Sequence, residues 1–351
     1  MSAGMGADPR QAPAQDDMAE VEEPDLSADP TRALDHSVEA LGFEPGRRAR
    51  ALVEALPYIR RFRGAMVVVK YGGHAMTDPG LAASFARDIV LVSSVGLRPV
   101  VVHGGGPQIG EHLRKLGKQS EFRDGLRVTD AETLEVARMV LVGKVGRDIV
   151  SAINASGGAA LGLSGEDGRL VTAVGRDPAL GFVGDVAAVN PRLIERLVGR
   201  EIVPVVSSIG ADAGGQAYNI NADTMAAALA GALGAAKVVY LTDVPGLLAD
   251  PAEVSSLMSR ATVAEVEAMI ASGAVSGGMI PKARACVDAV LGGAGSAHML
   301  DGRTPHAVLL ELFTDAGIGT MITQDTEHRT LNTEHRTLNT EDRTPNTEDP
   351  P

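Results

Sequence analysis

Short apolar runs recur along the chain, and amphipathic segments of helical length separate most of them. Runs bounded by glycine or proline are typical of buried strands, whereas apolar residues three and four positions apart indicate helices. The pattern predicts strands over residues 67–69, 98–103, 160–163, 202–207 and 237–241, one that ends at 298–300 and one that follows 317–319. It predicts helices over residues 47–62, 81–95, 108–116, 130–142, 144–155, 191–197, 224–233, 263–272 and 306–313, and one whose first turn contains Pro281. This alternation is typical of an α/β protein with parallel strands.

The helix predicted over residues 47–62 carries one apolar stripe, formed by Leu52, Leu56, Ile59 and Phe62. Pro57 is expected to kink it, because proline removes a helical hydrogen bond. The stripe either packs on the chain's own domain or forms an arm that docks on another subunit.

Two of the predicted strands end in glycine turns. Residues 67–69 lead into Lys70, Gly72 and Gly73, and the strand over 98–103 leads into a Gly-Gly-Gly-Pro turn. Glycines leave backbone N–H groups uncovered and Lys70 adds a fixed charge, so the first turn can surround an anion such as a phosphate. Because the carboxyl ends of neighbouring parallel strands meet at one edge of a sheet, the two turns predict one shared site.

Residues 170–189 interrupt the alternation of strands and helices. Short β-like runs are separated there by Gly175, Gly181 and Gly184, which predicts hairpins. Such hairpins are expected to form a lid over the site at the first glycine turn.

Two basic residues stand close to predicted helix starts. Arg127 precedes Thr129 and Asp130, either of which is a suitable N-cap, and there it can meet a carboxylate bidentately. Lys282 lies inside the helical turn that contains Pro281, where its ammonium joins free N–H groups in a place suited to phosphate. For both residues the alternative is an ordinary solvated side chain.

Polar residues gather before the small-residue helix predicted over 224–233. Asn219, Asn221 and Asp223 alternate in an apolar neighbourhood, either as a capping cluster with Asp223 as N-cap or as part of a site. Further on, Thr242 and Asp243 occupy a strand-end turn of the kind that lines nucleotide pockets.

Charge is concentrated at the two ends of the chain. The net charge is −13, but residues 1–45 contribute −9 and residues 324–351 contribute −4, so residues 46–323 are formally neutral. A neutral body with no Trp lacks the basic face and most of the stacking platforms of a nucleic-acid-binding protein. A small-molecule site is therefore favoured over a nucleic-acid partner.

Cys286 is the single cysteine, which excludes an internal disulfide and any multi-cysteine metal site. It is expected to fill the core. No apolar run approaches the roughly 20 residues of a membrane span, and the acidic N-terminus fits neither a secretory nor a transit signal. We therefore expect no membrane contact and a cytoplasmic location.

Both ends are expected to be disordered. Residues 1–45 are rich in Ala, Pro, Asp and Glu, and the tail from Thr326 repeats Thr-Glu-His-Arg-Thr-Leu-Asn. Each seven-residue unit offers one apolar residue, so a coiled coil is not expected.

Six motifs occur in a characteristic order: Lys-Tyr-Gly-Gly-His, His-Gly-Gly-Gly-Pro-Gln, Gly-Leu-Arg-Val-Thr, Asn-Ile-Asn-Ala-Asp, Thr-Asp-Val-Pro-Gly-Leu and Gly-Gly-Met-Ile-Pro-Lys. Together they resemble the amino acid kinase family, most closely its members that phosphorylate N-acetyl-L-glutamate in arginine biosynthesis. The resemblance covers about residues 51–323. It implies a three-layer αβα sandwich around an open, mainly parallel sheet.

The resemblance also implies an organisation along the chain and a set of ligands. A kinked helical arm over 46–63 would precede an acetylglutamate-binding lobe over 64–236 and a nucleotide-binding lobe over 237–323, between the disordered ends. The substrates would be N-acetyl-L-glutamate and ATP. Mg²⁺ would be carried by the ATP phosphates and water, since the sequence offers no dedicated carboxylate cage.

Roles for individual residues follow from the same resemblance. Lys70 and Lys282 would hold the phosphoryl groups from two sides, and Asp223 would orient both lysines. Gly73, Gly105 and Gly106 would donate N–H groups, Arg127 would clamp a substrate carboxylate, Asn219 would bind near the acetamido group, and Thr242 and Asp243 would contact the nucleotide. A carboxylate acceptor is already ionised at neutral pH, so no general base is required.

The N-terminal arm and the segment 306–320 resemble those of arginine-inhibited, hexameric family members. This implies a homohexamer, a trimer of dimers, inhibited by L-arginine bound near Tyr58, His306, Glu311 and Gly317. Glu166 stands where many relatives carry lysine, and neither the acidic head nor the repeated tail has a counterpart in the family.

Two other functions stay open at the level of sequence. One is another carboxylate kinase of the same fold, acting on an aminoadipate derivative, glutamate, aspartate or carbamate. The other is a non-catalytic arginine-sensing or partner-binding protein, although both lysines and Asp223 are retained.

Overall fold

The computed structural model describes residues 45–123, 125–250, 252–314 and 317–324. The predicted disorder at the two ends lies outside the described residues, except that Pro45 begins a helix and Gln324 follows the last strand. The chain divides into two units, residues 1–52 and residues 53–351. Helix α2 (Pro45–Phe62) starts in the first unit and continues through Pro57 as one element.

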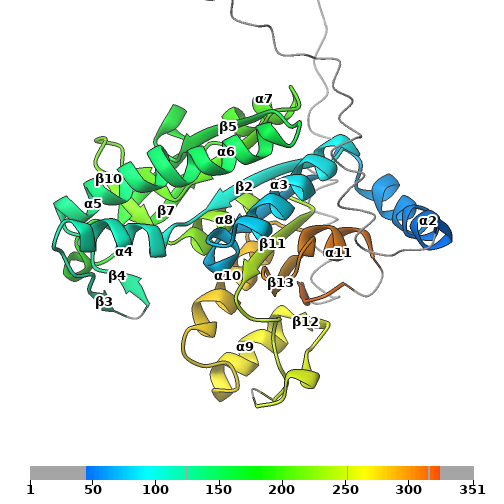
Figure 1. Ribbon diagram of the computed structural model, residues 1–351. Coiled ribbons are helices and arrows are strands. Elements are labelled where there is room, and N and C mark those ends of the chain that lie inside the picture. The colour runs from blue at the N-terminus through cyan, green and yellow to red at the C-terminus, as the bar shows by residue number, and fades with distance from the viewer. Residues whose placement is uncertain (1–44, 124, 251, 315–316, 325–351) are drawn as a thin grey trace, which may run out of the picture. The chain divides into compact units, whose positions relative to one another are not determined.

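The second unit is built on an eight-stranded sheet in the order β12-β14-β13-β11-β1-β2-β8-β5 (Figure 1). Every neighbouring pair is parallel except β13 and β14, which are antiparallel. The strands are β1 (Met66–Tyr71), β2 (Arg98–His103), β5 (Ala160–Ser164), β8 (Val203–Ser207), β11 (Lys237–Thr242), β12 (Arg260–Thr262), β13 (Ala297–Asp301) and β14 (Thr320–Thr323).

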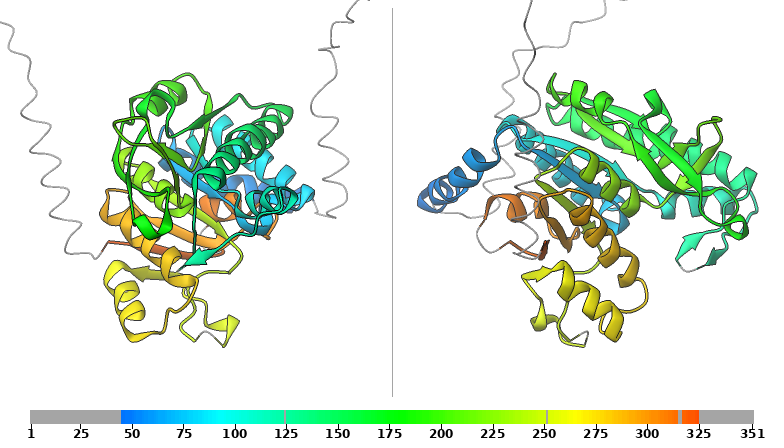
Figure 2. Two further views of the ribbon diagram at one scale, coloured as in Figure 1. Left: turned by 90° about the vertical axis from the view of Figure 1, so that its left-hand side faces the viewer. Right: turned by 180° about the vertical axis from the view of Figure 1, so that it is seen from behind.

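Two apolar cores lie on the two faces of this sheet. Alternate residues of one strand enter different cores, as Val68 does against Val67 and Val69, because successive side chains of a strand point to opposite faces. Helices cover both faces (Figure 2). The first core is completed by α7 (Arg192–Val198), α8 (Ala222–Ala232), α9 (Val263–Ser272) and α10 (Met279–Leu291), and the second by α3 (Pro79–Ser94), α4 (Gly106–Lys115), α5 (Ala131–Arg138), α6 (Gly146–Ala155) and α11 (Ala307–Phe313). The predicted three-layer, mainly parallel αβα sandwich is confirmed.

A small closed sheet stands beside the large one, in the order β10-β7-β6-β9. Its strands are β6 (Val171–Gly175), β7 (Val183–Val189), β9 (Ile209–Ala211) and β10 (Ala217–Ile220). The antiparallel pair of β6 and β7 confirms the hairpin predicted within 170–189. Strands β3 (Phe122–Arg123) and β4 (Leu126–Arg127) form a separate antiparallel pair.

The two helices predicted over 130–142 and 144–155 form one continuous helical segment. Helix α5 passes into a π-helix, Met139–Val145, which passes into α6. The separation at residue 143 was wrong because Gly143 lies in the widened turn without ending the helix. Leu141 and Val145 of the π-helix lie close to Gly105. A Cβ on Gly105 would lie 2.7 Å from Leu141 Cδ2.

Shorter helical turns join the remaining elements. They are the 3₁₀ segments η1 (Gly73–Met76), η3 (Asp167–Arg169), η4 (Pro178–Leu180) and η5 (Val254–Ser256). Across the described part of the chain, every helix is too short or too polar to cross a lipid bilayer.

Candidate active site

Lys70 lies near the carboxyl end of β1, next to the first glycine turn. Its side chain folds against the turn, so that a Cβ on Gly72 would lie 2.9 Å from Lys70 Nζ. Gly73 has φ +71°, and a Cβ there would lie 2.6 Å from Asp243 Oδ1. Gly73 is therefore needed in this turn, because it combines a left-handed backbone with a close carboxylate, and Gly72 leaves room for the Lys70 ammonium.

Asp223 lies in the first turn of α8 and is not its N-cap. Asn221 caps the helix, and its side-chain oxygen accepts hydrogen bonds from the N–H groups of Asp223 and Thr224. The alternative in which Asp223 is the N-cap was therefore wrong, and the Asp223 carboxylate is left available for another purpose.

The Asp223 carboxylate lies between two ammonium groups. Lys70 Nζ is 2.8 Å from Oδ1 and Lys282 Nζ is 3.9 Å from Oδ2. At 2.8 Å the Lys70 ammonium is close enough to donate a charge-assisted hydrogen bond to Oδ1. Burial opposes ionisation, yet the charges of Lys70 and Lys282 together hold the pKa of Asp223 below its ordinary value.

The two lysines differ in exposure. The side chain of Lys70 is 10% exposed and that of Lys282 is 31% exposed. Lys282 follows Pro281 in the first turns of α10, as predicted, and it reaches Asp223 on α8. The structure thus brings two distant lysines to one carboxylate.

The second glycine turn has its carbonyl groups occupied. His103 Nδ1 donates to Gly104 O at 2.9 Å, the Ile109 N–H donates to Gly105 O at 2.9 Å, and Arg127 Nη2 donates to Gly106 O at 2.8 Å. The N–H groups of Gly105 and Gly106 have no acceptor within the described residues. These two N–H groups are therefore available to bind an anion.

A cavity of about 190 Å³ adjoins this loop. Its lining includes the three loop glycines, Leu141, Val183, Arg127 and Asn219. Arg127 is 8% exposed, so the solvated-surface alternative was wrong. Its guanidinium donates to Gly106 O and to Ser120 Oγ and lies 4.7 Å from the ring centroid of Phe122.

Asn219 enters the cavity from β10 and is tied to the Arg127 segment. Its Nδ2 donates to Thr129 Oγ1 at 3.2 Å, and Thr129 Oγ1 donates to Arg127 O at 2.8 Å. Ala222, just before Asp223, also lines the cavity and lies close to Gly104. The cavity and the lysine–aspartate cluster therefore share the start of α8.

Thr242 is the last residue of β11, which lies on the other side of β1 from β2, and Asp243 follows it. Thr242 is buried, and its hydroxyl lies 2.9 Å from Val244 O and 3.3 Å from Leu300 O, either of which can accept its proton; the oxygen accepts the Val244 N–H at 3.2 Å, which closes the turn. Asp243 lies against Gly73, next to the Lys70 turn.

Among the residues described, no three His, Cys, Asp or Glu side chains gather as a metal site would require.

Comparison with known proteins identifies this arrangement. The profile of the amino acid kinase family matches residues 65–301, more than half of the chain. The chain belongs to the amino acid kinase family.

Within the amino acid kinase family the chain is similar to acetylglutamate kinases. It is 53% identical over 280 residues to that of Syntrophomonas wolfei subsp. wolfei, covering 79% of this chain and 98% of the relative. It is 56% identical over 286 residues to that of Acidothermus cellulolyticus, covering 78% and 96%.

The chain is also similar to solved structures of N-acetylglutamate synthase from Neisseria gonorrhoeae. The complex with coenzyme A and N-acetyl-glutamate has a TM-score of 0.71 and 26% identity, and covers 79% of this chain and 64% of that chain. The complex with coenzyme A and L-arginine has a TM-score of 0.67 and 25% identity, with coverage of 79% and 65%. The chain thus spans less than two thirds of the synthase, but nearly all of each kinase.

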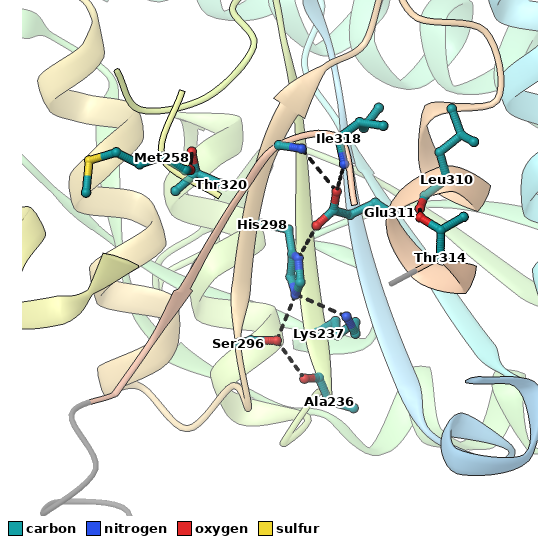
Figure 3. A network of polar contacts seen from close by, with 11 residues as sticks. Ala236, Lys237, Met258, Ser296, His298, Leu310, Glu311, Thr314, Ile318 and Thr320 are labelled. Carbon is teal, nitrogen blue, oxygen red and sulfur yellow. Dashed lines mark hydrogen bonds and ion pairs between the residues drawn. The ribbon is translucent and has the colours of Figure 1, made fainter. Parts of the chain in front are cut away.

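The four residues predicted to lie near the effector do not share one set of contacts. Glu311 is buried in a polar network: its Oε1 is 2.6 Å from His298 Nδ1, and its Oε2 accepts the N–H groups of Ile318 and Gly319 (Figure 3). A Cβ at Gly317 would lie 2.8 Å from Glu311 Oε2. Burial opposes ionisation of Glu311, but these contacts hold its pKa below the ordinary value.

His306 and Tyr58 contact other parts of the chain. His306 donates its backbone N–H to Ser84 Oγ, and its Nδ1 is 2.6 Å from Asp88 Oδ1. Tyr58, on α2, packs against the apolar core shared with α11. Glu166, the departure from the family pattern, pairs with Arg138 at 2.8 Å.

Sequence reasoning missed several polar residues that the structure connects to the site or the Glu311 network. His103 and Thr129 bond the loop and the cavity residues, and Lys237 Nζ lies 3.3 Å from His298 Nε2. The first two belonged to recognised motifs, so their position beside the glycines and Arg127 was an available signal. Lys237 lies at the start of a strand and outside the motifs, so nothing in the sequence signalled its role.

His103 gives this loop a predicted dependence on pH. Burial lowers the pKa of His103 to about 4, although its hydrogen bond to Gly104 partly offsets the shift. An unfolded histidine takes up a proton near pH 6.5, so acidification between pH 6.5 and 4 favours the unfolded chain, by a total of about 3 kcal/mol. The stability contribution is complete above pH 6.5 and is lost as the pH falls.

The matched variant is His103→Asn, which keeps a donor for Gly104 O and does not titrate. Urea unfolding at several pH values should show a smaller acid loss of stability for the variant than for the wild type. Equal losses over this range would contradict a buried, neutral His103.

Proposed function

We propose that the chain is an acetylglutamate kinase, which transfers the γ-phosphoryl group of ATP to the side-chain carboxylate of N-acetyl-L-glutamate. The products are N-acetyl-L-glutamyl 5-phosphate and ADP. One observation carries the proposal: the Lys70–Asp223–Lys282 cluster adjoins a glycine-lined cavity that contains Arg127 and Asn219. The acetylglutamate kinases that span nearly the whole folded chain support the choice of substrate.

The chemistry requires positive potential more than proton transfer. Two anions must approach each other, and the acceptor carboxylate is already ionised, so alignment and charge stabilisation supply the catalysis. Lys70 and Lys282 would lie on two sides of the migrating group. Asp223 would hold their ammonium groups apart and aimed at one gap, while the N–H groups of Gly73, Gly105 and Gly106 would stabilise the phosphoryl oxygens.

The cavity would hold the acceptor. Arg127 would bind its α-carboxylate, and Asn219 would contact the acetamido group. Because the Arg127 guanidinium is already held by Gly106 O and Phe122, it would bind a carboxylate without a large reorganisation.

ATP would bind on the side of Lys282, Thr242 and Asp243. We place acetylglutamate binding in residues 64–236 and nucleotide binding in 237–323. Mg²⁺ would supply charge neutralisation on the ATP phosphates, and activity should disappear when EDTA removes the metal. We place the reaction in the cytoplasm, which cell fractionation with an antibody to the chain would test.

A single assay separates this function from its alternatives. Purified protein, ATP and Mg²⁺ are incubated with each candidate acid, and hydroxylamine traps the acyl phosphate. Turnover with N-acetyl-L-glutamate alone supports the proposal. If the enzyme instead turns over an aminoadipate derivative, glutamate, aspartate or carbamate, that acid would be assigned as its substrate. No turnover with any acid would favour a non-catalytic protein.

Lys70→Ala should lower kcat by on the order of a hundred- to a thousandfold, because it removes one preorganised positive donor. Lys115→Ala is the control, since that lysine pairs with Glu111 on the exposed face of α4. Circular dichroism establishes that both variants are folded. Near-normal turnover by folded Lys70→Ala would remove this lysine from the mechanism.

We also infer inhibition by L-arginine near Glu311, Gly317, His306 and Tyr58. The buried, ionised carboxylate of Glu311 could pair with the guanidinium of arginine. The polar network of Glu311 extends through His298 to Lys237, and Lys237 Nζ lies 5.1 Å from the ring centroid of Phe62 on α2. The similarity to a synthase crystallised with L-arginine supports this assignment.

Millimolar arginine near neutral pH should inhibit the kinase, and Glu311→Gln should raise the inhibitory concentration about tenfold by removing a charge-assisted contact. Citrulline, which lacks the positive charge, serves as the control ligand. Full activity of the wild type at millimolar arginine would refute the regulatory proposal.

Finally, we infer a homohexamer formed as a trimer of dimers through α2. Val53 and Leu56 are three positions apart on this helix and are 70% and 41% exposed, and Leu52 is 75% exposed. Exposed apolar side chains so closely spaced are typical of an interaction surface.

Sedimentation velocity should give the mass of six chains for the wild type and of two chains for Val53→Asp with Leu56→Asp. Glu54→Ala, an exposed polar change on the same helix, should remain hexameric. A wild-type chain that sediments as a monomer or dimer would exclude this assembly.

A further inference from the structure

Thr129 uses every polar group it has, although it is fully buried. Its N–H donates to Leu180 O at 2.9 Å, and its carbonyl accepts the Phe182 N–H at 2.7 Å. Its hydroxyl donates to Arg127 O at 2.8 Å and accepts from Asn219 Nδ2 at 3.2 Å. Three segments therefore meet at one residue that does not itself line the cavity.

The backbone around Thr129 leaves little room for adjustment. Gly181 forms an isolated parallel bridge with Thr129, has φ +68° and faces Thr129 O at a distance that no side chain would tolerate. Phe182, next along, accepts the Asn219 N–H on its own carbonyl at 2.9 Å. Hydrogen bonds therefore link both the backbone and the side chain of Asn219 to Thr129, directly for the side chain and through Phe182 for the backbone.

The hydroxyl decides which end of the Asn219 amide faces Thr129. A hydroxyl has one proton, and here it is donated to Arg127 O, which can only accept. Thr129 Oγ1 must therefore accept from its other partner, so Asn219 presents Nδ2 to it. This leaves Oδ1 of Asn219, a residue that lines the cavity, without a bond to Thr129, so that Oδ1 can accept from a ligand.

We propose that Thr129 is a positioning residue that makes the site selective for acceptors carrying an N–H donor at the carbon next to the clamped carboxylate. This inference rests on the proposed function, because it assigns the acetamido N–H of N-acetyl-L-glutamate to Asn219 Oδ1. An acceptor with an ester oxygen in place of that N–H would place this oxygen against Asn219 Oδ1, and neither atom could donate a hydrogen bond. A site built to accept a donor discriminates against an analogue that lacks it.

The test compares N-acetyl-L-glutamate with its isosteric ester, O-acetyl-(S)-2-hydroxyglutarate. Dissociation constants from calorimetry and KM values are measured for the wild type, Thr129→Val and Thr129→Ser. The wild type should bind the amide at least about tenfold more tightly than the ester. Valine keeps the shape of threonine but frees the Asn219 amide to turn, so the ratio should fall close to one, whereas serine keeps the hydroxyl and should keep the ratio.

The ratio separates positioning from general damage. A merely structural role would weaken amide and ester alike, and the KM for ATP would change with them. An unchanged amide-to-ester ratio in Thr129→Val would overturn the proposal, as would loss of the ratio in Thr129→Ser. If the valine variant does not fold, Thr129→Ala removes the same hydroxyl without added bulk, and the same two outcomes apply.

Calorimetry also separates this inference from the proposed function. A wild type that binds the amide selectively but forms no acyl phosphate would contradict the kinase and leave the role of Thr129 supported. A wild type that binds amide and ester equally would contradict the role of Thr129 even if both are phosphorylated.

Discussion

Burying a carboxylate between two ammonium groups is costly unless the charges remain paired, and the site depends on this constraint. Asp223 is 7% exposed and touches Lys70 and Lys282, which come from β1 and α10. Removing one member of a buried pair typically costs about 3–5 kcal/mol, because the remaining charge loses its partner. The same cost keeps both lysines directed at one gap, and a phosphoryl group would enter a field that is already in place.

Much of this arrangement was readable in the sequence, because strong local patterns determined it. Valine-rich runs predicted the central strands, glycines marked the turns after β1 and β2, and Asp130 caps α5 as expected. The order of the strands in the sheet was not readable. Pairing between strands far apart in the sequence, such as β1 with β11, depends on tertiary packing, which local periodicity does not report.

The sequence left alternatives open where several interactions compete for one polar group. Asp223 has the composition of an N-cap, but Asn221 takes that role and Asp223 turns to the lysines. Arg127 could have been a surface residue, and only the fold buries it against Gly106 and Phe122. Thr129 was considered only as a cap, since its four hydrogen bonds join segments that are far apart in the chain.

The most direct test of the account is a crystal structure of the protein with N-acetyl-L-glutamate, Mg²⁺, ADP and aluminium fluoride, a mimic of the phosphoryl group in transfer. The account predicts that Lys70 Nζ and Lys282 Nζ lie on opposite sides of the fluoride, each within about 3 Å of a fluorine or phosphate oxygen, with Asp223 still between them. A fluoride bound elsewhere, or either ammonium turned away from it, would contradict the central claim.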